Sequence, residues 1–166
     1  MQMARLCGGR VLAADISSEK LEKAKTLGAD EIIDAKEKNL AQEVLRLTDG
    51  KGAESVLDFV ASSQTLQAGF ESLARAGKLV ILGYRPSSVF KVDPSFRLDP
   101  VAVLQKGLEI HGSRYVSMAE LLDAVKLVQQ GRIKPIVTRT FPLEEAETAH
   151  QMILANKITG RAALAI

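Results

Sequence analysis

Residues 10–28 read RVLAADISSEKLEKAKTLG, and this stretch decides the fold class. An aliphatic run ends at Asp15, which is typical of a buried parallel strand with a polar carboxyl end. Ser17 or Ser18 can then cap a helix, and Gly28 provides a stop signal at its other end. The apolar residues of that helix recur at near-helical spacing; they are Leu21, Ala24 and Leu27. The stretch therefore predicts a strand followed by a helix.

The same strand–helix unit recurs along the chain. Further strands or extended segments are predicted at residues 31–33, 55–60, 78–83, 108–111, 136–141 and 161–166. Further helices are predicted at residues 1–6, 36–48, 65–75, 100–106, 117–130 and 143–155. A proline-containing connection at residues 84–100 is expected to hold a short strand at 89–92. Because parallel neighbours need crossover connections, this alternation predicts an α/β fold with a doubly wound parallel sheet.

Composition and charge limit the classes of partner. The chain has 166 residues with 22 Lys and Arg against 20 Asp and Glu, which gives a net charge of +2. No block of like charge forms a nucleic-acid footprint or a polybasic membrane patch. No apolar run approaches the roughly 20 residues of a membrane span, and the start lacks the features of a secretory signal. We therefore expect neither nucleic acid nor a membrane as a partner, and a cytoplasmic location.

Cysteine and histidine are too few for a metal centre made by this chain alone. Cys7 is the single cysteine, so an internal disulfide is excluded, and we expect it to be a small buried residue. The two histidines, His111 and His150, are not clustered with it at metal-ligand spacing. We expect both to be structural or solvated side chains.

Glycine motifs do not form a phosphate-binding loop in this chain. No G-x-G-x-x-G lies between a predicted strand and a predicted helix. Gly50-x-Gly52 precedes a strand and predicts a turn, whereas Gly8-Gly9 ends a helix, which is the wrong polarity for holding phosphate. The helix at residues 1–6 has no N-cap, so we expect it to begin before this chain does.

Four motifs in order resemble the C-terminal half of the medium-chain dehydrogenase/reductase superfamily, the zinc-type alcohol dehydrogenases in particular. They are Ala14 to Asp30 (ADISSEKLEKAKTLGAD), Lys78 to Gly83 (KLVILG), Leu108 to Ser113 (LEIHGS) and Gly160 to Leu164 (GRAAL). The similarity spans essentially the whole chain. It implies a Rossmann-like sheet truncated at its N-terminal strand and glycine loop, with residues 1–135 as a partial NAD-binding domain. Residues 136–166 are the part that in this family returns to the catalytic domain.

The resemblance also implies what is missing. In this family the catalytic domain with its zinc ligands, the first strand and the glycine loop precede this segment. Because the first strand is central in the sheet order, its absence is expected to leave a gap between the strand ending at Asp15 and the strand starting at Ser55. Either the chain is a fragment of a longer enzyme, or it closes the gap or borrows a strand from a partner.

Asp15 is the sharpest candidate site residue. An acid at the carboxyl end of the second strand of a dinucleotide-binding fold can accept both adenosine ribose hydroxyls. The alternative is a helix-capping or solvated loop aspartate. The resemblance implies that Asp15 binds the ribose, that Lys20 reaches the same sugar, and that NAD is preferred over NADP, since a carboxylate repels the 2′-phosphate.

The resemblance implies further cofactor contacts. Phe59 and Val60 would flank the adenine, with ordinary core packing as the alternative. Leu82, Gly83 and Tyr84 lie where the backbone approaches the nicotinamide, and Gly83 suits such a close approach. Ser113 and Tyr115 lie where backbone groups hold the carboxamide. Arg161 matches an arginine that contacts the pyrophosphate, with a surface arginine as the alternative.

The function that follows is the NAD-binding portion of an alcohol or polyol dehydrogenase, which transfers hydride between an alcohol and the nicotinamide. No catalytic residue and no metal ligand is assigned in this chain, so we expect it to be inactive alone, with zinc only in the missing part. The alternatives are part of a zinc-independent quinone or enoyl reductase, or a non-catalytic nucleotide-binding or oligomerisation module. The resemblance also implies a homo-oligomer, because in this family the strand matching residues 108–111 lies near a sheet edge that pairs across a two-fold axis. This edge is poorly defended by charge or proline, and Val101, Val103 and Leu104 add apolar surface. The alternative is that the gap left by the missing central strand drives any association.

Overall fold

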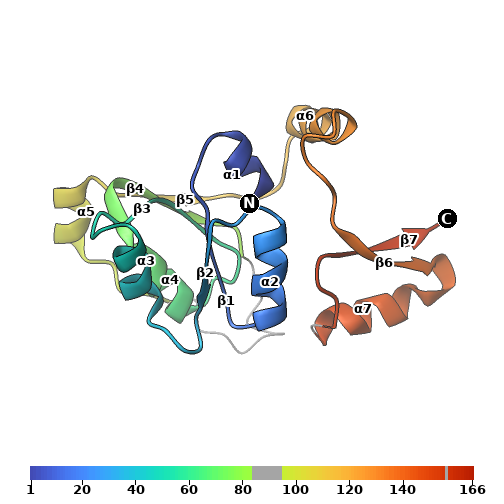
Figure 1. Cartoon of the computed structure of the whole chain (residues 1–166), viewed down its shortest axis with the longest axis horizontal. Helices are drawn as coiled ribbons and strands as arrows, with labels where there is room; N and C mark the ends of the chain where they lie inside the picture. Colours follow the sequence, from blue (N-terminus) through green and yellow to red (C-terminus); the bar gives the residue numbers. More distant parts are fainter. Residues whose placement is uncertain (84–94, 156) are drawn as a thin grey trace. The chain divides into compact units, whose positions relative to one another are not determined.

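The structure is a computed structural model that describes residues 1–83, 95–155 and 157–166. Tyr84 and the short strand expected at 89–92 lie outside the described residues. The chain divides into two compact units, Met3–Val116 and Ser117–Ile166 (Figure 1). Both units alternate strands with helices, and every strand pair in them is parallel, which confirms the predicted α/β class.

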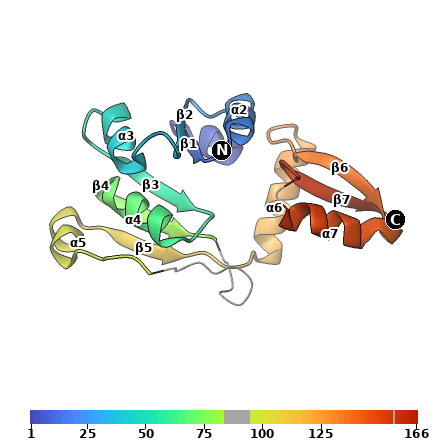
Figure 2. The same cartoon turned by 90° about the horizontal axis from the view of Figure 1, so that it is seen from below.

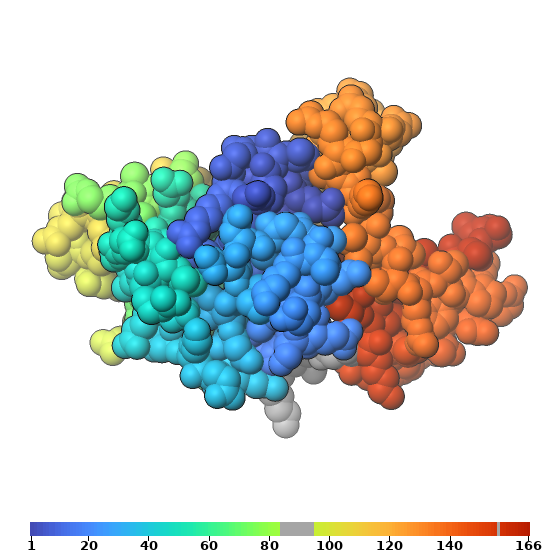
Figure 3. All heavy atoms as spheres, in the orientation of Figure 1, coloured from blue at the N-terminus to red at the C-terminus, as the bar shows by residue number. Residues whose placement is uncertain are grey.

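The first unit begins with two strand–helix repeats. After helix α1 (Gln2–Leu6) come β1 (Leu12–Asp15), α2 (Ser18–Thr26), β2 (Glu31–Asp34) and α3 (Leu40–Leu47). Strands β1 and β2 pair in parallel from Leu12 opposite Glu31 to Asp15 opposite Asp34. The apolar stripe predicted for α2 is confirmed at Leu21 and Ala24, which are buried. Figure 3 shows one face of this unit, on which side chains of α2 and α3 form the surface.

Three more parallel strands form a second sheet in the same unit. The elements are β3 (Ala53–Asp58), α4 (Ser63–Glu71), β4 (Leu73–Ile81), α5 (Pro100–Lys106) and β5 (Glu109–Gly112), with the sheet order β3-β4-β5 (Figure 2). A buried apolar cluster lies between this sheet and its helices; it consists of Leu66, Phe70, Leu73, Leu79 and Leu108. Val103 packs against this cluster, so the expectation that it adds free apolar surface is wrong.

The two sheets of the first unit are not joined by strand pairing. Among the described strands, β1 pairs with β2 and β3 pairs with β4, and β1 and β3 are not hydrogen-bonded neighbours. The expected gap between the strand of Asp15 and the strand of Ser55 is therefore confirmed. Leu57, near the end of β3, is 51% exposed. Each of these edges carries backbone groups able to pair with a further strand.

Several predicted helix boundaries were wrong, and the α-helix expected at 143–155 begins only at Ala146, after a 3-10 turn. The helix expected at 36–48 begins only at Leu40, because the Asn39 side chain accepts from Gln42 N and caps it there. The helix expected at 65–75 ends at Glu71, where the buried Ser72 hydroxyl donates to the Gly69 carbonyl at 2.9 Å. Strand β4 begins directly afterwards at Leu73, which is fully buried and pairs with Ala53.

The second unit contains α6 (Met118–Gln129), β6 (Val137–Pro142), the 3-10 turn η1 (Leu143–Glu145), α7 (Ala146–Leu154) and β7 (Arg161–Ala165). Strands β6 and β7 are parallel, and Phe141 and Ala149 are buried. The predicted capping box is confirmed: the Ser117 hydroxyl accepts from Glu120 N, and Glu120 accepts from Ser117 N at 2.8 Å. In the part of the chain that the structure describes, no helix has the length and apolar character needed to span a membrane.

Candidate functional site

Asp15 ends β1, and its carboxylate is held by a local turn. The Oδ1 atom accepts from Ser17 N at 2.9 Å, and the Ser17 hydroxyl in turn accepts from Lys20 N and caps α2. The serine expected as Ser17 or Ser18 is therefore Ser17. Asp15 has the geometry of a loop aspartate next to a helix cap, and this turn also fixes the direction of its carboxylate. Lys20 lies half-buried in the first turn of α2, close to Asp15 along the chain.

The carboxyl ends of β3, β4 and β5 lie side by side. Asp58 pairs with Ile81, and Ile81 pairs with Gly112, so the residues that follow these three positions leave the sheet at one edge. The residues expected to contact a cofactor after these strands are Phe59, Val60, Leu82, Gly83, Ser113 and Tyr115. The structure brings this group together by strand register. Asp15 and Lys20 follow a strand of the other sheet, so no pairing places them in that register.

Phe59 and Val60 form an exposed apolar loop. Their exposed fractions are 68% and 37%, which excludes the core-packing interpretation for both side chains in this chain. The loop is nevertheless well defined by hydrogen bonds, because Asp58 Oδ1 accepts from Val60 N at 2.7 Å and from Ala61 N at 3.0 Å. Ala61 adopts a left-handed backbone with φ +53°.

Asp58 was missed by reasoning from the sequence. It is 6% exposed, and its Oδ2 atom accepts from the Thr65 hydroxyl at 2.8 Å. Thr65 also completes a capping box with Ser62 at the start of α4. The available signal was an acid at a strand end followed by the Ser62-x-x-Thr65 pattern, which marks a capped helix.

Leu82 and Gly83 are fixed to the same loop. Both of their amides donate to the Asp58 carbonyl, at 2.8 Å and 2.9 Å. A Cβ atom on Gly83 would lie 2.6 Å from the carbonyl carbon of Phe59. The close approach expected at Gly83 is thus made by the protein's own backbone, and this contact accounts for the glycine before any cofactor is considered.

Ser113 and Tyr115 continue from β5. Ser113 N donates to the Ile81 carbonyl at 2.9 Å, which extends the pairing with β4. Tyr115 has φ +63° and is 85% exposed, and the Arg114 guanidinium lies 4.6 Å from the centre of its ring. The hydrogen bond from Ser113 N therefore fixes the backbone where this loop leaves β5.

Arg161 begins β7 in the second unit and is exposed. Its amide donates to the Ile136 carbonyl at 2.8 Å, which makes it part of the β6–β7 pairing. The structure places the Arg161 side chain at the surface, as the alternative of a surface arginine expects. Contact with a pyrophosphate stays a prediction.

The histidines and the cysteine are solvent-facing. His111 Nε2 lies 2.7 Å from Glu109 Oε2, and Lys78 Nζ lies 3.2 Å from the same oxygen. The hydrogen bond with His111, and then that with Lys78, lowers the pKa of Glu109. His150 is exposed on α7.

Cys7 is also exposed, so the expectation of a buried cysteine was wrong. Helix α1 ends there without packing its C-terminus into a core. Across the described ranges, no three His, Cys, Asp or Glu side chains are grouped to hold a metal ion.

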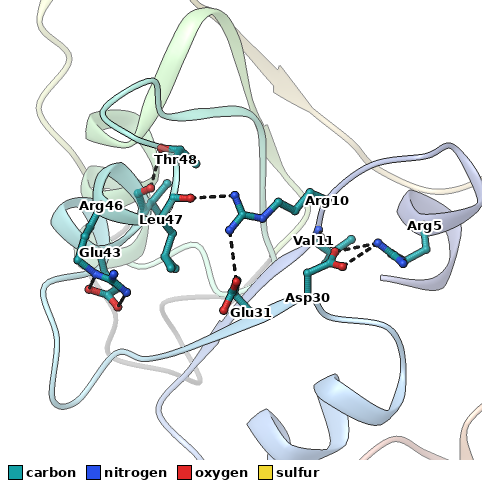
Figure 4. A network of polar contacts seen from close by, with 10 residues as sticks. Arg5, Arg10, Val11, Asp30, Glu31, Glu43, Arg46, Leu47 and Thr48 are labelled. Atoms are coloured by element: carbon teal, nitrogen blue, oxygen red, sulfur yellow. Dashed lines mark hydrogen bonds and ion pairs between the residues drawn. The ribbon is translucent and has the colours of Figure 1, made fainter.

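A polar network lies at the amino ends of β1 and β2, away from the carboxyl ends that carry the candidate site residues (Figure 4). Arg10 joins the start of β1 to the end of α3, donating to the Leu47 carbonyl at 2.8 Å and pairing with Glu31 at 3.3 Å. On α3, Glu43 accepts from both Arg46 and Lys38, and these two hydrogen bonds lower its pKa to about 2. The network connects elements of the fold, and we assign no cofactor role to it.

Comparisons with known proteins identify the family of this chain. A family model described as zinc-binding dehydrogenase matches residues 1–130. An NAD-dependent alcohol dehydrogenase of Sulfurisphaera tokodaii is 33% identical over 99% of this chain and 46% of its own length. One of Saccharolobus solfataricus is 31% identical over the same shares of the two chains. The chain thus spans about half the length of the curated relatives it matches.

A solved structure extends the comparison to three dimensions. The alcohol dehydrogenase of the hyperthermophilic archaeon Aeropyrum pernix is 29% identical, with a TM-score of 0.86, over 99% of this chain and 45% of its own. The resemblance drawn from the four sequence motifs is confirmed. The chain belongs to the zinc-binding dehydrogenase family.

Proposed function

We propose that this chain is the nucleotide-binding portion of an NAD-dependent alcohol or polyol dehydrogenase. The observation that carries the proposal is the register of β3, β4 and β5, which gathers the loop at Phe59, the turn at Gly83 and the loop at Ser113 at one sheet edge. Open parallel sheets bind their ligands outside the carboxyl ends of their strands. The relatives named as NAD-dependent alcohol dehydrogenases support the choice of ligand and of reaction.

The residues present suit a dinucleotide. Asp15 would accept the adenosine ribose hydroxyls with its oriented carboxylate, and Lys20 would reach the same sugar. Phe59 and Val60 offer exposed apolar surface for the adenine. Leu82, Gly83 and Tyr84 would approach the nicotinamide, the backbone at Ser113 and Tyr115 would hold its carboxamide, and Arg161 would contact the pyrophosphate.

The chemistry of the parent enzyme follows from the cofactor. NAD accepts a hydride from the carbinol carbon of an alcohol when it is bound. The chain described here would bind and orient the dinucleotide, and the carboxylate of Asp15 would disfavour the 2′-phosphate of NADP. Zinc ligands and the proton-transfer groups would come from the other half of the parent enzyme, so we expect no alcohol oxidation by this chain alone.

We also propose that the chain forms a homo-oligomer and works in the reducing cytoplasm. All four residues of β5 are exposed, and Val101 and Leu104 on the preceding helix are 56% and 83% exposed. This edge carries no proline, which would otherwise oppose pairing with a second copy. A single cysteine suits a compartment that does not form disulfides.

Calorimetric titration of the chain with NADH and with NADPH tests the cofactor assignment. We expect saturable binding of NADH, with NADPH bound more weakly. Absence of NADH binding at millimolar concentration would reject the proposed function for this chain and favour a non-catalytic module.

A further inference from the structure

Asp58 is a buried carboxylate whose partners all belong to one loop. Its side chain accepts three hydrogen bonds, from Val60 N, Ala61 N and the Thr65 hydroxyl, at 2.7, 3.0 and 2.8 Å. All three donors are neutral groups. A carboxylate has two acceptor oxygens and no donor of its own when ionised, so it satisfies several converging donors that a single carbonyl could not.

The same residue holds the neighbouring strand through its backbone. The Asp58 carbonyl accepts from Leu82 N and Gly83 N at 2.8 and 2.9 Å. Gly83 in turn leaves room for the loop, since a Cβ there would lie 2.8 Å from the carbonyl carbon of Val60. Asp58 therefore determines where the loop after β3 lies and how it meets the end of β4.

What this loop presents to solvent is apolar. Phe59 is 68% exposed, while Ala61, whose amide Asp58 holds, is 9% exposed and has φ +53°. A left-handed alanine costs free energy, which the surrounding hydrogen bonds must offset. A strained loop that is fixed from beneath and apolar on its outer side is preorganised for a ligand, because little ordering remains to be lost on binding.

We propose that Asp58 is a positioning residue for the dinucleotide: it holds residues 59–62 in the binding conformation without contacting the ligand. This inference rests on the proposed function. Asp58 sets the affinity for the dinucleotide through its hydrogen bonds with the loop amides and not through its charge.

The substitutions Asp58→Ala and Asp58→Asn separate these effects. Alanine removes both acceptor oxygens and with them all three hydrogen bonds, and we expect NADH binding to weaken roughly tenfold to a hundredfold, as for lost hydrogen bonds to a charged group. Asparagine keeps Oδ1 for the two amides, and its NH₂ can donate to the Thr65 hydroxyl, which can itself donate to the Ser62 carbonyl already 3.2 Å away. We expect Asp58→Asn to restore most of the affinity.

A matched control is Asp99→Ala. Asp99 also accepts a hydrogen bond from a nearby backbone amide, that of Val101 at 2.9 Å, and it caps α5 in the same unit. We expect this substitution to lower stability with NADH affinity unchanged. If Asp58→Ala does not fold, Thr65→Val removes the donor to Oδ2 in a side chain of similar shape and should give a smaller loss of affinity.

Amide hydrogen exchange measured by NMR reports directly on the hydrogen bonds that hold the loop. We expect Val60 and Ala61 to be protected in the parent chain and in Asp58→Asn, and to exchange faster in Asp58→Ala. Unchanged NADH affinity in Asp58→Ala, or equal losses in Asp58→Ala and Asp58→Asn, would overturn the proposal. If the parent chain binds no NADH while the exchange pattern is as expected, the proposed function fails; the structural role of Asp58 then stands, and its role toward the dinucleotide is rejected.

Discussion

Gly83 lies against the backbone of Phe59 so closely that a Cβ atom would come within 2.6 Å of the Phe59 carbonyl carbon. The contact joins the end of β4 to the loop after β3, and both partners are backbone atoms that cannot rotate away. The glycine is therefore required by packing within this chain, whether or not a ligand lies beside it.

Gly83→Ala should destabilise the first unit. Overpacking against backbone costs about 1–3 kcal/mol, and urea unfolding followed by circular dichroism measures it. Gly112→Ala is the matched control, because a Cβ there would meet nothing within 4 Å and Gly112 ends the neighbouring strand β5. Equal stability of the two variants would show that the loop can move away from Gly83.

Glu43 should make stability depend on pH in the acid range. Its pKa is lowered from 4.5 to about 2 by hydrogen bonds from Arg46 and Lys38. A group whose folded pKa is depressed stabilises the fold above its unfolded pKa, and this contribution is lost as the pH falls toward the folded value. The stability difference between the parent chain and Glu43→Gln should therefore be constant above about pH 5 and shrink as the pH falls toward 2.

Denaturant unfolding at several pH values checks this prediction. Glu22→Gln is the control, since Glu22 makes a single exposed ion pair with Lys25 at 3.3 Å. Because the Lys38 and Arg46 side chains that pair with Glu43 are exposed to solvent, added salt should also reduce the difference. A difference that does not change with pH would mean that the charge of Glu43 contributes nothing to stability.

Asp15 should determine the choice between NAD and NADP. Replacing Asp15 with Ser and Ile16 with Arg removes the repulsion of the 2′-phosphate and adds a cation for it. Ile16 is 60% exposed, so the arginine can be accommodated. We expect the ratio of the Kd values for NADPH and NADH to fall at least tenfold, as for a gain of about 1.4 kcal/mol, and an unchanged ratio would count against Asp15 as the ribose ligand.

Capping patterns and apolar spacing correctly predicted features that depend only on residues close in sequence. The Ser117 and Glu120 capping box and the stripe of α2 depend on residues within a few positions of one another, and both are present. The break between the strands of Asp15 and Ser55 was also predicted, because the family's sheet order states which neighbour is missing. The cap and the stripe need no knowledge of the tertiary packing, whereas the break followed from the resemblance to a family whose sheet order is known.

The end of α4 was predicted wrongly because tertiary contacts decide it, whereas the start of α3 was predicted wrongly although its Asn39 cap is a local signal. Residues 72–75 have a composition compatible with helix, yet Leu73 enters β4 because it is buried in the core and pairs with Ala53. Asp58 was missed although its partners Val60, Ala61 and Thr65 are close in sequence, because the pattern does not show that they converge on its carboxylate when the loop folds. The contact of Gly83 with the backbone of Phe59 was not predicted, because it joins the ends of two different strands; the approach of Gly83 to the nicotinamide stays a prediction.

The strand β5 should mediate self-association. Its four residues are exposed, Ile110 is 39% exposed, and Leu104 on the preceding helix is 83% exposed. Ile110→Pro removes a backbone donor and should convert a dimer into a monomer, which light scattering at micromolar concentration measures. Ile110 pairs with Leu79 of β4 on its inner side, so circular dichroism must first show that the fold is retained. A monomeric parent chain would refute self-association altogether. An Ile110→Pro dimer with retained fold would instead point to the edges of β1 and β3, which face the expected gap between their strands and have no described strand partner there.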